Sequence, residues 1–447
     1  MKIVIVGAGA VGFHLAERLS EEGQDVVVVE HDPQRAEKIG DQLDVLAIAG
    51  NGASVPVLED AGTEDAALFL AVTNRDEVNI IACLAASMMG AGNTVARLSD
   101  PEFYAEGSVL SRERLGIELM INPEREAAWE TYQLLGSEAA TELIRFAEGR
   151  VQLIGLRVLA DAPVVGQNLA ELDRELSDRH FTTVAISRDG ETEIPTGASH
   201  FEAGDHAFLI TPSSEVHTIP PLAGYEPYRL RRVMVAGGSR EAVYLAEYLA
   251  QNGVACTIID KDRARCRALS EELPDALILH GDATDLELLE MEGVSDVDGF
   301  VAFTDRDSTN MLSSLLAKAC GARKVISLLH NFQYIPLVTR VGIDAAVSPR
   351  LSAVNTILRY LHHGNVARVV TLKGIDAEAV EVRIGAAAKM LGKPLRKIDF
   401  PEGGLVGSII REGEVINPRG DDAVQEGDRV ILFALPHIMP KLERMFA

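Results

Sequence analysis

Short runs of valine, isoleucine and leucine alternate with helical patterns over the first 124 residues. Apolar runs of this kind, separated by helices, are typical of parallel strands that are covered on both faces. The expected strands are Lys2–Val6, Val26–Glu30, Val45–Ala49, Ala67–Val72, Thr94–Leu98 and Leu119–Ile121. Between the first two, His14–Glu22 has the pattern of an amphipathic helix. This region therefore predicts an α/β fold with a Rossmann-like, doubly wound parallel sheet.

The sequence pattern changes after this region, from alternating strands and helices to short strands separated by turns. We expect Trp129–Ala147 to be a helix that joins the first sheet to this second region. Glycine marks turns at Asp189-Gly190 and Gly204-Asp205, as between the strands of hairpins. The expected strands are Val151–Val158, Thr183–Ile186 and Ala207–Ile210. The prediction is a small α+β domain with a short sheet.

The same arrangement occurs twice along the chain. The matched pairs are Gly7 and Gly237, Thr73 and Thr304, Gly166 and Gly392, and Gly204 and Gly427, at offsets of 230, 231, 226 and 223. A nearly constant offset over unrelated stretches indicates duplication of a whole unit, not a short-period solenoid. We therefore predict four domains, at positions 1–124, 143–226, 230–348 and 366–447.

Sequence patterns also indicate the segments that connect these domains. The segment from Pro220-Pro221 to Tyr228 is rich in proline and is expected to link the two halves. Leu358–Gly364 is expected to join the domains of the second half, with Gly364-Asn365 as its stop.

A glycine loop follows the first strand and opens a helix. Its sequence, Gly7 to Gly12, fits G-x-G-x-x-G in the context that the motif requires. Gly7 permits the tight turn, Gly9 lets the backbone approach a pyrophosphate, and Gly12 lets helix and strand pack closely. The free amides at the helix start favour phosphate charge. A sterically required glycine turn is the alternative.

An acidic residue supports nucleotide binding. Glu30 ends the second strand 21 residues after Gly9, where a carboxylate holds the ribose hydroxyls of the adenosine. A carboxylate there disfavours a 2′-phosphate, so NAD(H) is expected in preference to NADP(H). Asp32, before Pro33, is expected to cap a helix.

Other strand ends complete the predicted crevice. Asn51 and its neighbours close the third strand and are expected against the adenine, while Thr73 and Asn74 close the fourth. Arg97 is a lone cation among Val95, Ala96 and Leu98, and a buried charge needs a partner. Phosphate is one partner for it; the other reading is a carboxylate, Asp100 or Glu102.

The second glycine loop keeps the scaffold but changes the fingerprint. Ser239 and Ala242 stand where the first copy has glycines, and Asp260 still ends the second strand, 21 residues after Ser239. Arg240 lies in the loop, where a guanidinium can hold terminal phosphates, although an exposed helix-start arginine is the alternative. We therefore expect two inequivalent sites.

Composition narrows the choice of partners and compartment. The chain carries 42 Lys and Arg against 67 Asp and Glu, a net charge of −25, which argues against nucleic acid or anionic lipid as primary partners. Such a surface is also common in salt-tolerant cells. The four cysteines have no CxxC spacing, so reduced thiols without zinc are expected. No apolar run reaches the ~20 residues of a membrane helix and no signal peptide is expected, which predicts the cytosol.

Several motifs together resemble the RCK (KTN) family. They are Thr73–Asn79 and Thr304–Asn310, which fit T-[DN]-x-D-x-x-N, Gly166–Leu169 and Gly392–Leu395, which fit G-x-x-L, and the G-D pairs at Gly204-Asp205 and Gly427-Asp428. With the glycine loop and the acidic strand ends, the order N–C–N–C covers nearly the whole chain. This order is similar to the tandem members of the family, the peripheral subunits of bacterial Trk potassium uptake systems.

The resemblance implies a cytoplasmic subunit, peripheral on the inner face of the cell membrane. It implies a homo-oligomeric, tetrameric ring beneath a TrkH- or TrkG-like potassium-translocating subunit. NAD(H), ATP or ADP in the Rossmann crevices would then shift the ring and the potassium flux. The implied binding residues are Gly7, Ala8, Gly9, Ala10, Val11, Glu30, Thr73, Asn74 and Arg97, with a second set at Gly237, Ser239, Arg240 and Asp260.

An NAD-dependent oxidoreductase is the rival from another class. It would need a proton-transferring group facing the nicotinamide, yet the strand end beside the loop carries Thr73 and Asn74. The His362-His363 pair lies at a predicted helix end, where capping the last carbonyls is its expected role. We therefore expect a regulator without catalytic or metal-binding residues. A scaffold that has lost its ligand, or an RCK-type regulator of another ion transporter, remain alternatives.

Overall fold

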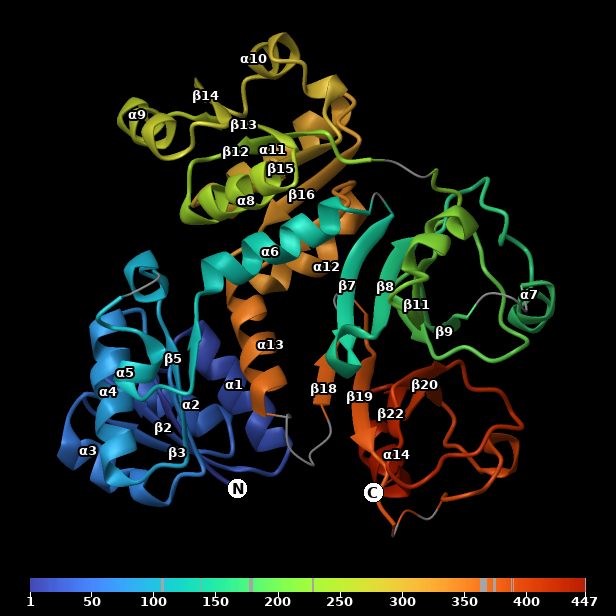
Figure 1. Ribbon diagram of the computed structural model, residues 1–447, viewed down its shortest axis with the longest axis horizontal. Coiled ribbons are helices and arrows are strands. Elements are labelled where there is room, and N and C mark those ends of the chain that lie inside the picture. Colours follow the sequence, from blue (N-terminus) through green and yellow to red (C-terminus); the bar gives the residue numbers. More distant parts are fainter. Residues whose placement is uncertain are drawn as a thin grey trace. The chain divides into compact units, whose positions relative to one another are not determined.

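The computed structural model describes residues 1–105, 108–137, 139–176, 180–226, 229–361, 368–372, 375–386, 388 and 390–446. Its contacts divide the chain into two units, whose helices and strands are labelled in Figure 1. The first consists of Met1–Ala127 together with Ser348–Ile357, and the second of Ala128–Val347 together with Leu358–Ala447.

The first unit contains a six-stranded parallel sheet of the predicted Rossmann type. The strand order is β3-β2-β1-β4-β5-β6, in which the chain reverses direction across the sheet between β1 and β4. The strands are β1 (Lys2–Val6), β2 (Asp25–Glu30), β3 (Leu46–Ala49), β4 (Leu68–Ala71), β5 (Asn93–Arg97) and β6 (Leu119–Ile121). The helices are α1 (Ala10–Glu21), α2 (Pro33–Gln42), α3 (Val55–Asp60), α4 (Asp76–Met89) and α5 (Arg112–Leu115), with 3-10 turns at Thr63–Asp65 and Pro101–Tyr104. Each expected strand agrees with the observed one to within one residue at either end.

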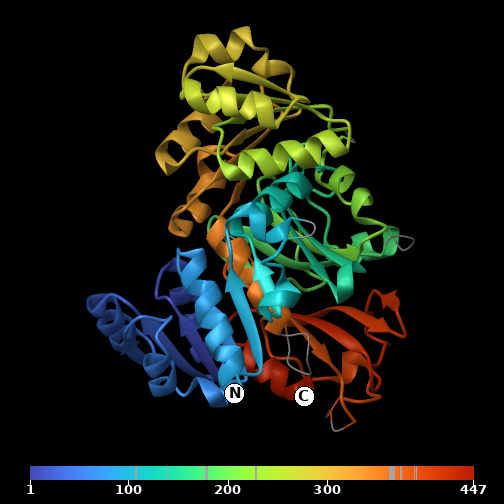
Figure 2. The ribbon, with the colours of Figure 1, turned by 60° about the vertical axis from the view of Figure 1, so that its left-hand side comes forward.

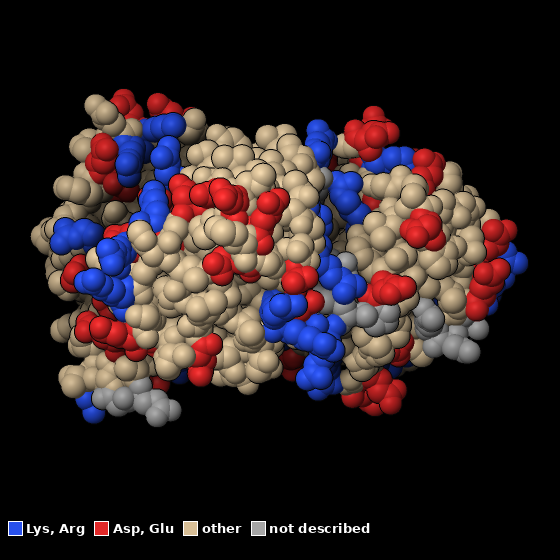
Figure 3. Space-filling model, turned by 90° about the horizontal axis from the view of Figure 1, so that it is seen from above, with Lys and Arg blue, Asp and Glu red and all other residues tan. Residues whose placement is uncertain are grey.

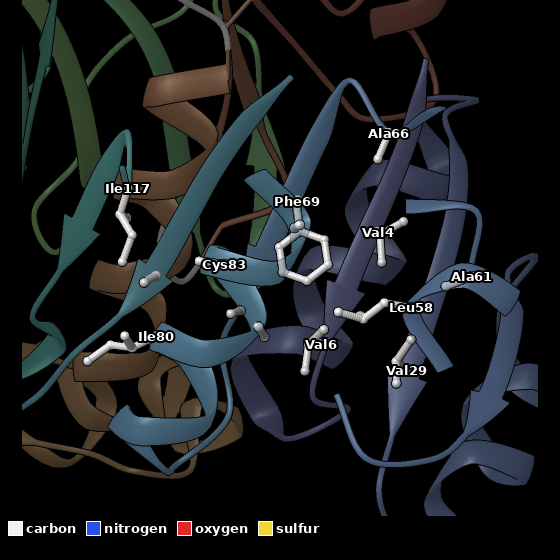
Figure 4. Close-up of a cluster of buried hydrophobic side chains, with 14 of the residues drawn as sticks. Val4, Val6, Val29, Leu58, Ala61, Ala66, Phe69, Ile80, Cys83 and Ile117 are labelled. Atoms are coloured by element: carbon white, nitrogen blue, oxygen red, sulfur yellow. The ribbon is translucent and has the colours of Figure 1, made fainter. Parts of the chain in front are cut away.

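Aliphatic side chains fill the space between this sheet and its helices. Phe69 on β4 is fully buried beside Val4 and Val6 of β1, and Leu58 of α3 closes the cluster (Figure 4). Strands buried on both faces explain the continuous apolar runs in the sequence. This core fixes the strand ends from which the candidate site is built.

The second unit repeats the parallel sheet in the same order, β14-β13-β12-β15-β16-β17, which confirms the duplication. Its strands are β12 (Arg232–Ala236), β13 (Ala255–Asp260), β14 (Ala276–His280), β15 (Gly299–Ala302), β16 (Lys324–Leu328) and β17 (Ala345–Val347). Its helices are α8 (Arg240–Gln251), α9 (Arg263–Glu272), α10 (Leu286–Met291), α11 (Asp307–Ala319) and α12 (Ile335–Val338), with 3-10 turns at Val294–Asp296, Phe332–Tyr334 and Thr339–Val341.

Two five-stranded antiparallel sheets follow the parallel ones and share one topology, β10-β9-β11-β8-β7 and β18-β19-β22-β20-β21. The strands of the first are β7 (Ala140–Phe146), β8 (Val151–Arg157), β9 (Thr182–Arg188), β10 (Glu191–Glu193) and β11 (His206–Pro212). Those of the second are β18 (Arg368–Thr371), β19 (Glu378–Arg383), β20 (Gly404–Arg411), β21 (Glu414–Ile416) and β22 (Arg429–Ala434). Helices α7 (Leu169–Glu175) and α14 (Met439–Phe446) and 3-10 turns at Ala147–Gly149, Val216–Thr218 and Leu395–Lys397 complete these domains. The expected α+β class is thus confirmed.

These two antiparallel sheets lie side by side (Figures 1 and 2). Phe146 of the first meets Phe433 of the second with ring centroids 6.4 Å apart. Arg429 forms an ion pair with Glu148 at 2.7 Å, and Arg150 donates to the carbonyl of Gly413 at 2.8 Å. Apolar packing and polar contacts together hold the two small domains as a pair.

The predicted helix Trp129–Ala147 is wrong in its second half. Helix α6 (Pro123–Leu135) begins earlier and stops before Gly136, and Ala140–Phe146 is strand β7. Along β7 the backbone pairs with β8, because Leu143, Ile144 and Phe146 find apolar neighbours there. Strand pairing with a distant segment, which periodicity does not report, replaces the helix.

A buried lysine binds carbonyl groups at and just after the C-terminal end of α6. Lys324 on β16 is fully buried, and its Nζ donates to the carbonyls of Leu134 at 2.6 Å, Ala140 at 2.6 Å and Ser137. A cation at a helix C-terminus satisfies carbonyls that have no partner within the helix. The repeat places Asn93, an exposed residue, at the matching position of the first sheet.

The segments between domains also differ from expectation. Pro220–Ala223 is a 3-10 helix, and Leu222 and Ala223 are buried against the first small domain, so the link between the halves begins only after them. The second joining helix, α13 (Pro349–Leu361), begins nine residues before the predicted Leu358. Its predicted stop at Gly364-Asn365 and the His362-His363 pair lie outside the described residues. The domain limits 1–124, 143–226, 230–348 and 366–447 stay predictions.

Among the described helices, none is long and apolar enough to cross a membrane.

Candidate functional site

The first glycine loop has the geometry that its sequence predicts. Gly7 adopts a φ of +105°, which side-chain-bearing residues rarely take. A Cβ on Gly12 would lie 1.8 Å from the carbonyl oxygen of Gly7, so helix α1 can approach the loop only with glycine there. Both residues are therefore required by the chain's own backbone.

Gly9 is different, because the protein itself does not require a glycine there. Its φ of −68° is ordinary, and a Cβ at this position would meet nothing within 4 Å. Gly9 is the N-cap residue of α1 and supplies no side-chain hydrogen bond to the helix amides. The start of α1 thus leaves both open space and uncapped amides, which is the arrangement that a phosphate group needs.

Glu30 is buried at the end of β2, where it is 8% exposed. One carboxylate oxygen accepts the amide of Ala8 at 2.5 Å and the other accepts the amide of Asp32 at 3.0 Å. Glu30 therefore fixes the glycine loop as well as facing the crevice, and each oxygen retains a lone pair for a ribose hydroxyl. Asp32 accepts the amide of Gln34 at 2.9 Å, which confirms it as the cap of α2.

The motif after β4 binds the two neighbouring strand ends together. The side chain of Asn79 is fully buried; its Oδ1 accepts the amide and hydroxyl of Thr73 at 3.0 and 2.7 Å, and its Nδ2 donates to the carbonyl of Arg97 at 2.7 Å. Asp76 accepts the amides of Ser99 and Asp100, each at 2.9 Å. The T-x-x-D-x-x-N element thus holds the ends of β4 and β5 in place.

All nine first-copy candidates line one crevice of about 1050 Å³ at the carboxyl ends of the strands. A crevice at the point where strand order reverses is where doubly wound sheets bind ligands. The nine residues are Gly7 to Val11, Glu30, Thr73, Asn74 and Arg97. Asn51, Gly52 and Ala53, which were also expected at the crevice, line it as well.

Sequence reasoning missed part of the lining. Arg35, Arg75, Glu77, Ile81 and Arg350 also face the crevice. Arg35 follows β2, and Arg75, Glu77 and Ile81 follow β4. Because both strand ends were already expected at the crevice, these four residues could have been predicted to line it. Arg350 comes from the distant helix α13, and no local pattern pointed to it.

The partner of Arg97 is a carboxylate other than those expected. Its guanidinium lies 3.7 Å from Glu124 on α6, and Arg97 remains 24% exposed toward the crevice. Asp100 instead caps the following turn by accepting the amide of Glu102. Arg97 therefore has an intramolecular partner and still lines the crevice, so both kinds of contact are open to it.

In the second glycine loop, the chain's own side chains accept the amides at the start of the helix. Gly237 adopts a φ of +98°, and Gly238 donates its amide to Asp260 at 2.6 Å, which repeats the contact between Ala8 and Glu30. Ser239 takes the N-cap position of α8, and its hydroxyl accepts the amide of Ala242 at 3.4 Å. The side chain of Ser239 thus occupies the amides that Gly9 leaves open.

Two further side chains change the chemistry of the second loop. Arg265 donates its Nε to the carbonyl of Gly238 at 2.6 Å, whereas its counterpart Arg35 is 64% exposed near Asp32. Glu241, in the first turn of α8, is 8% exposed and places negative charge at the helix start. Arg240 is exposed. These contacts are less favourable to a dinucleotide phosphate than those of the first loop.

The G-D motifs of the small domains are structural. Asp205, 1% exposed, accepts Arg188 through two bonds of 2.8 Å, and Asp428, 2% exposed, accepts Arg411 at 3.0 and 2.8 Å. The adjacent carboxylate raises the pKa of Arg188 and of Arg411. Paired charges of this kind fix the turn rather than bind a ligand. Over the described part of the chain, no cluster of three or more His, Cys, Asp or Glu could hold a metal ion.

The chain thus falls in a class of proteins with two Rossmann-like domains in tandem, each followed by a small antiparallel domain. The TrkA-N domain model matches residues 3–123 and 233–349, and the TrkA-C domain model matches 153–223 and 379–447. The chain belongs to this TrkA family.

Curated relatives agree over the full length. The chain is 37% identical over 454 aligned positions to "Trk system potassium uptake protein TrkA homolog 1" of Methanosarcina mazei, with all of both chains covered. It is 36% identical to the "Trk system potassium uptake protein TrkA homolog" of Archaeoglobus fulgidus, again with full coverage of both. It is 34% identical to "Trk system potassium uptake protein TrkA" of Azorhizobium caulinodans, covering 98% of that protein.

Solved structures share the fold. The "Crystal Structure of the GsuK RCK domain" matches with a TM-score of 0.59 at 18% identity, covering 100% of this chain and 94% of the other. The "GsuK channel bound to NAD" matches with a TM-score of 0.60 at 19% identity, covering 100% of this chain and 78% of the other.

Proposed function

We propose that this chain is a nucleotide-sensing regulatory subunit of a Trk-type potassium uptake system. The observation that carries the proposal is the first crevice, where an open helix start, Gly9 and Glu30 lie together. The full-length relatives are named for potassium uptake, and one structure of the same fold is described as bound to NAD. NAD(H), ATP and ADP are the proposed ligands.

Within the crevice we assign roles from the sheet order. Glu30 and Asn51, on the β2–β3 side, would hold the adenosine ribose and the adenine edge. The amides after Gly7 would hold the phosphates. Thr73 and Asn74, just after β4, and Arg97 on β5 would face the far end of the nucleotide.

Regulation requires that the ligand prefers one of two conformations of the protein. Coupling of about 1–3 kcal/mol per site is typical, and several sites in one ring would multiply it. The proposed assembly is a tetrameric ring on the cytoplasmic face of the membrane, bound to a TrkH- or TrkG-like subunit. The four domains at 1–124, 143–226, 230–348 and 366–447 are its proposed parts.

A protein partner fits this surface better than nucleic acid does. The net charge is −25, and on the face shown in Figure 3 basic side chains are intermingled with acidic ones. Nucleic-acid binding requires a concentrated basic surface. The proposed partners are therefore the membrane subunit and further copies of this chain.

The proposed role is regulatory, not catalytic. The strand ends that face the crevice carry Thr73, Asn74 and Arg97, and the histidine in its lining, His31, follows β2 on the adenosine side. An oxidoreductase needs a proton-transferring group at the nicotinamide end. Regulation of another ion transporter through the same domains is the second candidate, supported by the channel structures that share the fold.

Calorimetric titration of the purified chain with NADH, NAD, ATP and ADP tests the proposal. Saturable binding of at least one nucleotide is expected, together with a nucleotide-dependent change in potassium flux when the chain is reconstituted with a Trk-type membrane subunit. Absence of binding to all four nucleotides would contradict the sensor. Binding without any effect on flux would favour the other transporter class.

A further inference from the structure

One cationic side chain in the first crevice comes from the second half of the chain. Arg350 lies near the start of α13, more than 220 residues after the first sheet ends, yet it lines the crevice with Gly9 and Arg97. It is exposed to solvent there.

Packing within the first unit holds the start of α13 in place. Ser348–Ile357 groups with Met1–Ala127, and Val354 and Ile357 of α13 are buried. Thr356 donates its hydroxyl to Glu126 of α6 at 2.9 Å. Several contacts along the helix therefore hold the residue at the crevice, independently of its own side chain.

These contacts also show from which side α13 approaches. Glu126 lies about half a turn beyond Glu124 on α6, and Glu124 is the partner of Arg97 at the end of β5. Glu30 ends β2, on the other side of β1 in the strand order. Helix α13 thus contacts the first turns of α6, the helix that carries the partner of Arg97, and in the strand order β5 and β6 lie across β1 from Glu30.

The two sides of the crevice differ in charge. Glu30 and Asp32 line the β2 side, and Arg35 there lies 3.7 Å from Asp32. On the β5 side, Arg97 is paired with Glu124 at 3.7 Å. A ligand that extends past the glycine loop toward β5 therefore lies among the lining side chains Arg75, Arg97 and Arg350, of which Arg97 also contacts Glu124.

We infer that Arg350 is a specificity-determining residue of the first site, which holds the terminal phosphates of a nucleoside polyphosphate. This inference rests on the proposed nucleotide-binding function. ATP and ADP end in a phosphate that carries uncompensated charge, and a guanidinium binds such a group through paired, charge-assisted hydrogen bonds. The pyrophosphate of NAD(H) is esterified at both ends and remains over the glycine loop. Arg350 thus distinguishes polyphosphate from dinucleotide.

The test is the ratio of dissociation constants for ATP and AMP in the full chain. In Arg350→Ala, the ATP constant is expected to rise tenfold or more, while the AMP and NADH constants change less than twofold. Arg350→Lys, which keeps the charge but loses the paired geometry, should have an intermediate ATP constant. Arg35→Ala is the matched control, since it removes the same charge from the β2 side and should leave the ATP-to-AMP ratio unchanged.

The outcomes separate this inference from the function on which it rests. A wild-type chain that binds no nucleotide contradicts the proposed function. A wild-type chain that binds ATP, with an unchanged ATP-to-AMP ratio in Arg350→Ala, contradicts the inference alone. Equal losses for ATP, AMP and NADH would also overturn it, because they would show a general effect on the crevice. The ratio is insensitive to a partial loss of folded protein.

Discussion

The two glycine loops of this chain share a backbone but differ in what completes it. Both begin with a glycine at positive φ, and in both a backbone amide donates a hydrogen bond to the acidic residue that ends the next strand. In the first, Gly9 leaves the helix start uncapped, whereas in the second Ser239 caps it. The backbone of the loop is thus kept after duplication, while the side chains around the start of the helix differ.

A second difference concerns how closely helix and strand approach. Gly12 leaves no room for a methyl group in the first copy, but the second copy holds Ala242, fully buried, at the matching position. The duplicated sheets therefore tolerate different spacing between loop and helix. The tighter first loop is the one whose start remains open to a ligand.

The largest expected effect comes from Gly9→Glu. A carboxylate in the open space at the start of α1 would repel phosphate and fill its position, so affinity for NADH and ATP at the first site should fall ~100-fold or more, about 3 kcal/mol. Titration calorimetry measures it, and an unchanged unfolding temperature checks the fold.

Ser239→Glu is the matched change in the second loop. It should alter NADH affinity by less than twofold. Nucleotide binding that persists at full strength in Gly9→Glu, with second-half binding accounted for, would rule out the assignment of the first loop.

Gly12→Ala is expected to destabilise the fold by about 2–3 kcal/mol, because the new methyl group would overlap the carbonyl of Gly7. The reciprocal change, Ala242→Gly, should cost only about 1 kcal/mol, through greater backbone freedom and the loss of one buried methyl. Chemical denaturation of both variants compares them. Equal costs would show that the two loops are spaced alike.

Arg240→Ala tests whether the second loop favours a triphosphate. In a Gly9→Glu background, any remaining ATP binding should weaken about tenfold, or about 1.4 kcal/mol, since a charge-assisted contact is lost. NADH binding should not change. Arg263→Ala, an exposed arginine at the start of α9, is the control. An ATP affinity indifferent to Arg240, or NADH binding as tight as in the first half, would remove this part of the asymmetry.

Glu30 should select against a 2′-phosphate. NADH is expected to bind at least ~10-fold tighter than NADPH, because like charges in a crevice repel by about 1 kcal/mol or more. Glu30→Gln should narrow that ratio while keeping an oxygen for the amide of Ala8. Competition titrations give the ratio, and equal affinities in the wild type would place Glu30 away from the ribose.

The smallest effect distinguishes the two antiparallel domains. Burial and the charge of Arg157 lower the pKa of His206 to about 3, while the second domain has Arg429 at the matching position. The unfolded chain, with a histidine pKa near 6.5, binds the proton first, so stability should fall by about 1 kcal/mol from pH 6.5 to 5.5. His206→Gln should remove that part of the slope in denaturation midpoints measured against pH. An identical slope in the variant would contradict it.

Local patterns predicted much of the fold and the first site. The strands near Lys2–Val6 and Asp25–Glu30, the cap at Asp32 and the duplication all follow from spacing along the chain. The requirement for glycine is also local. Gly7 has a positive φ, and Gly12 lies close to the carbonyl of Gly7, because of the turn itself. For this reason the sequence by itself determined the fold class, the repeat and the nine first-copy residues that line the crevice.

Only the tertiary structure decided the contacts made across long stretches of chain. Strand β7 forms because β8 pairs with it, Lys324 is buried because α6 ends against it, and Arg350 reaches the crevice because the first half of α13 packs within the first unit. Arg265 closes the second loop for the same kind of reason. Periodicity and motif spacing describe neighbours within a few turns of chain, whereas each of these contacts depends on which distant surface covers an element.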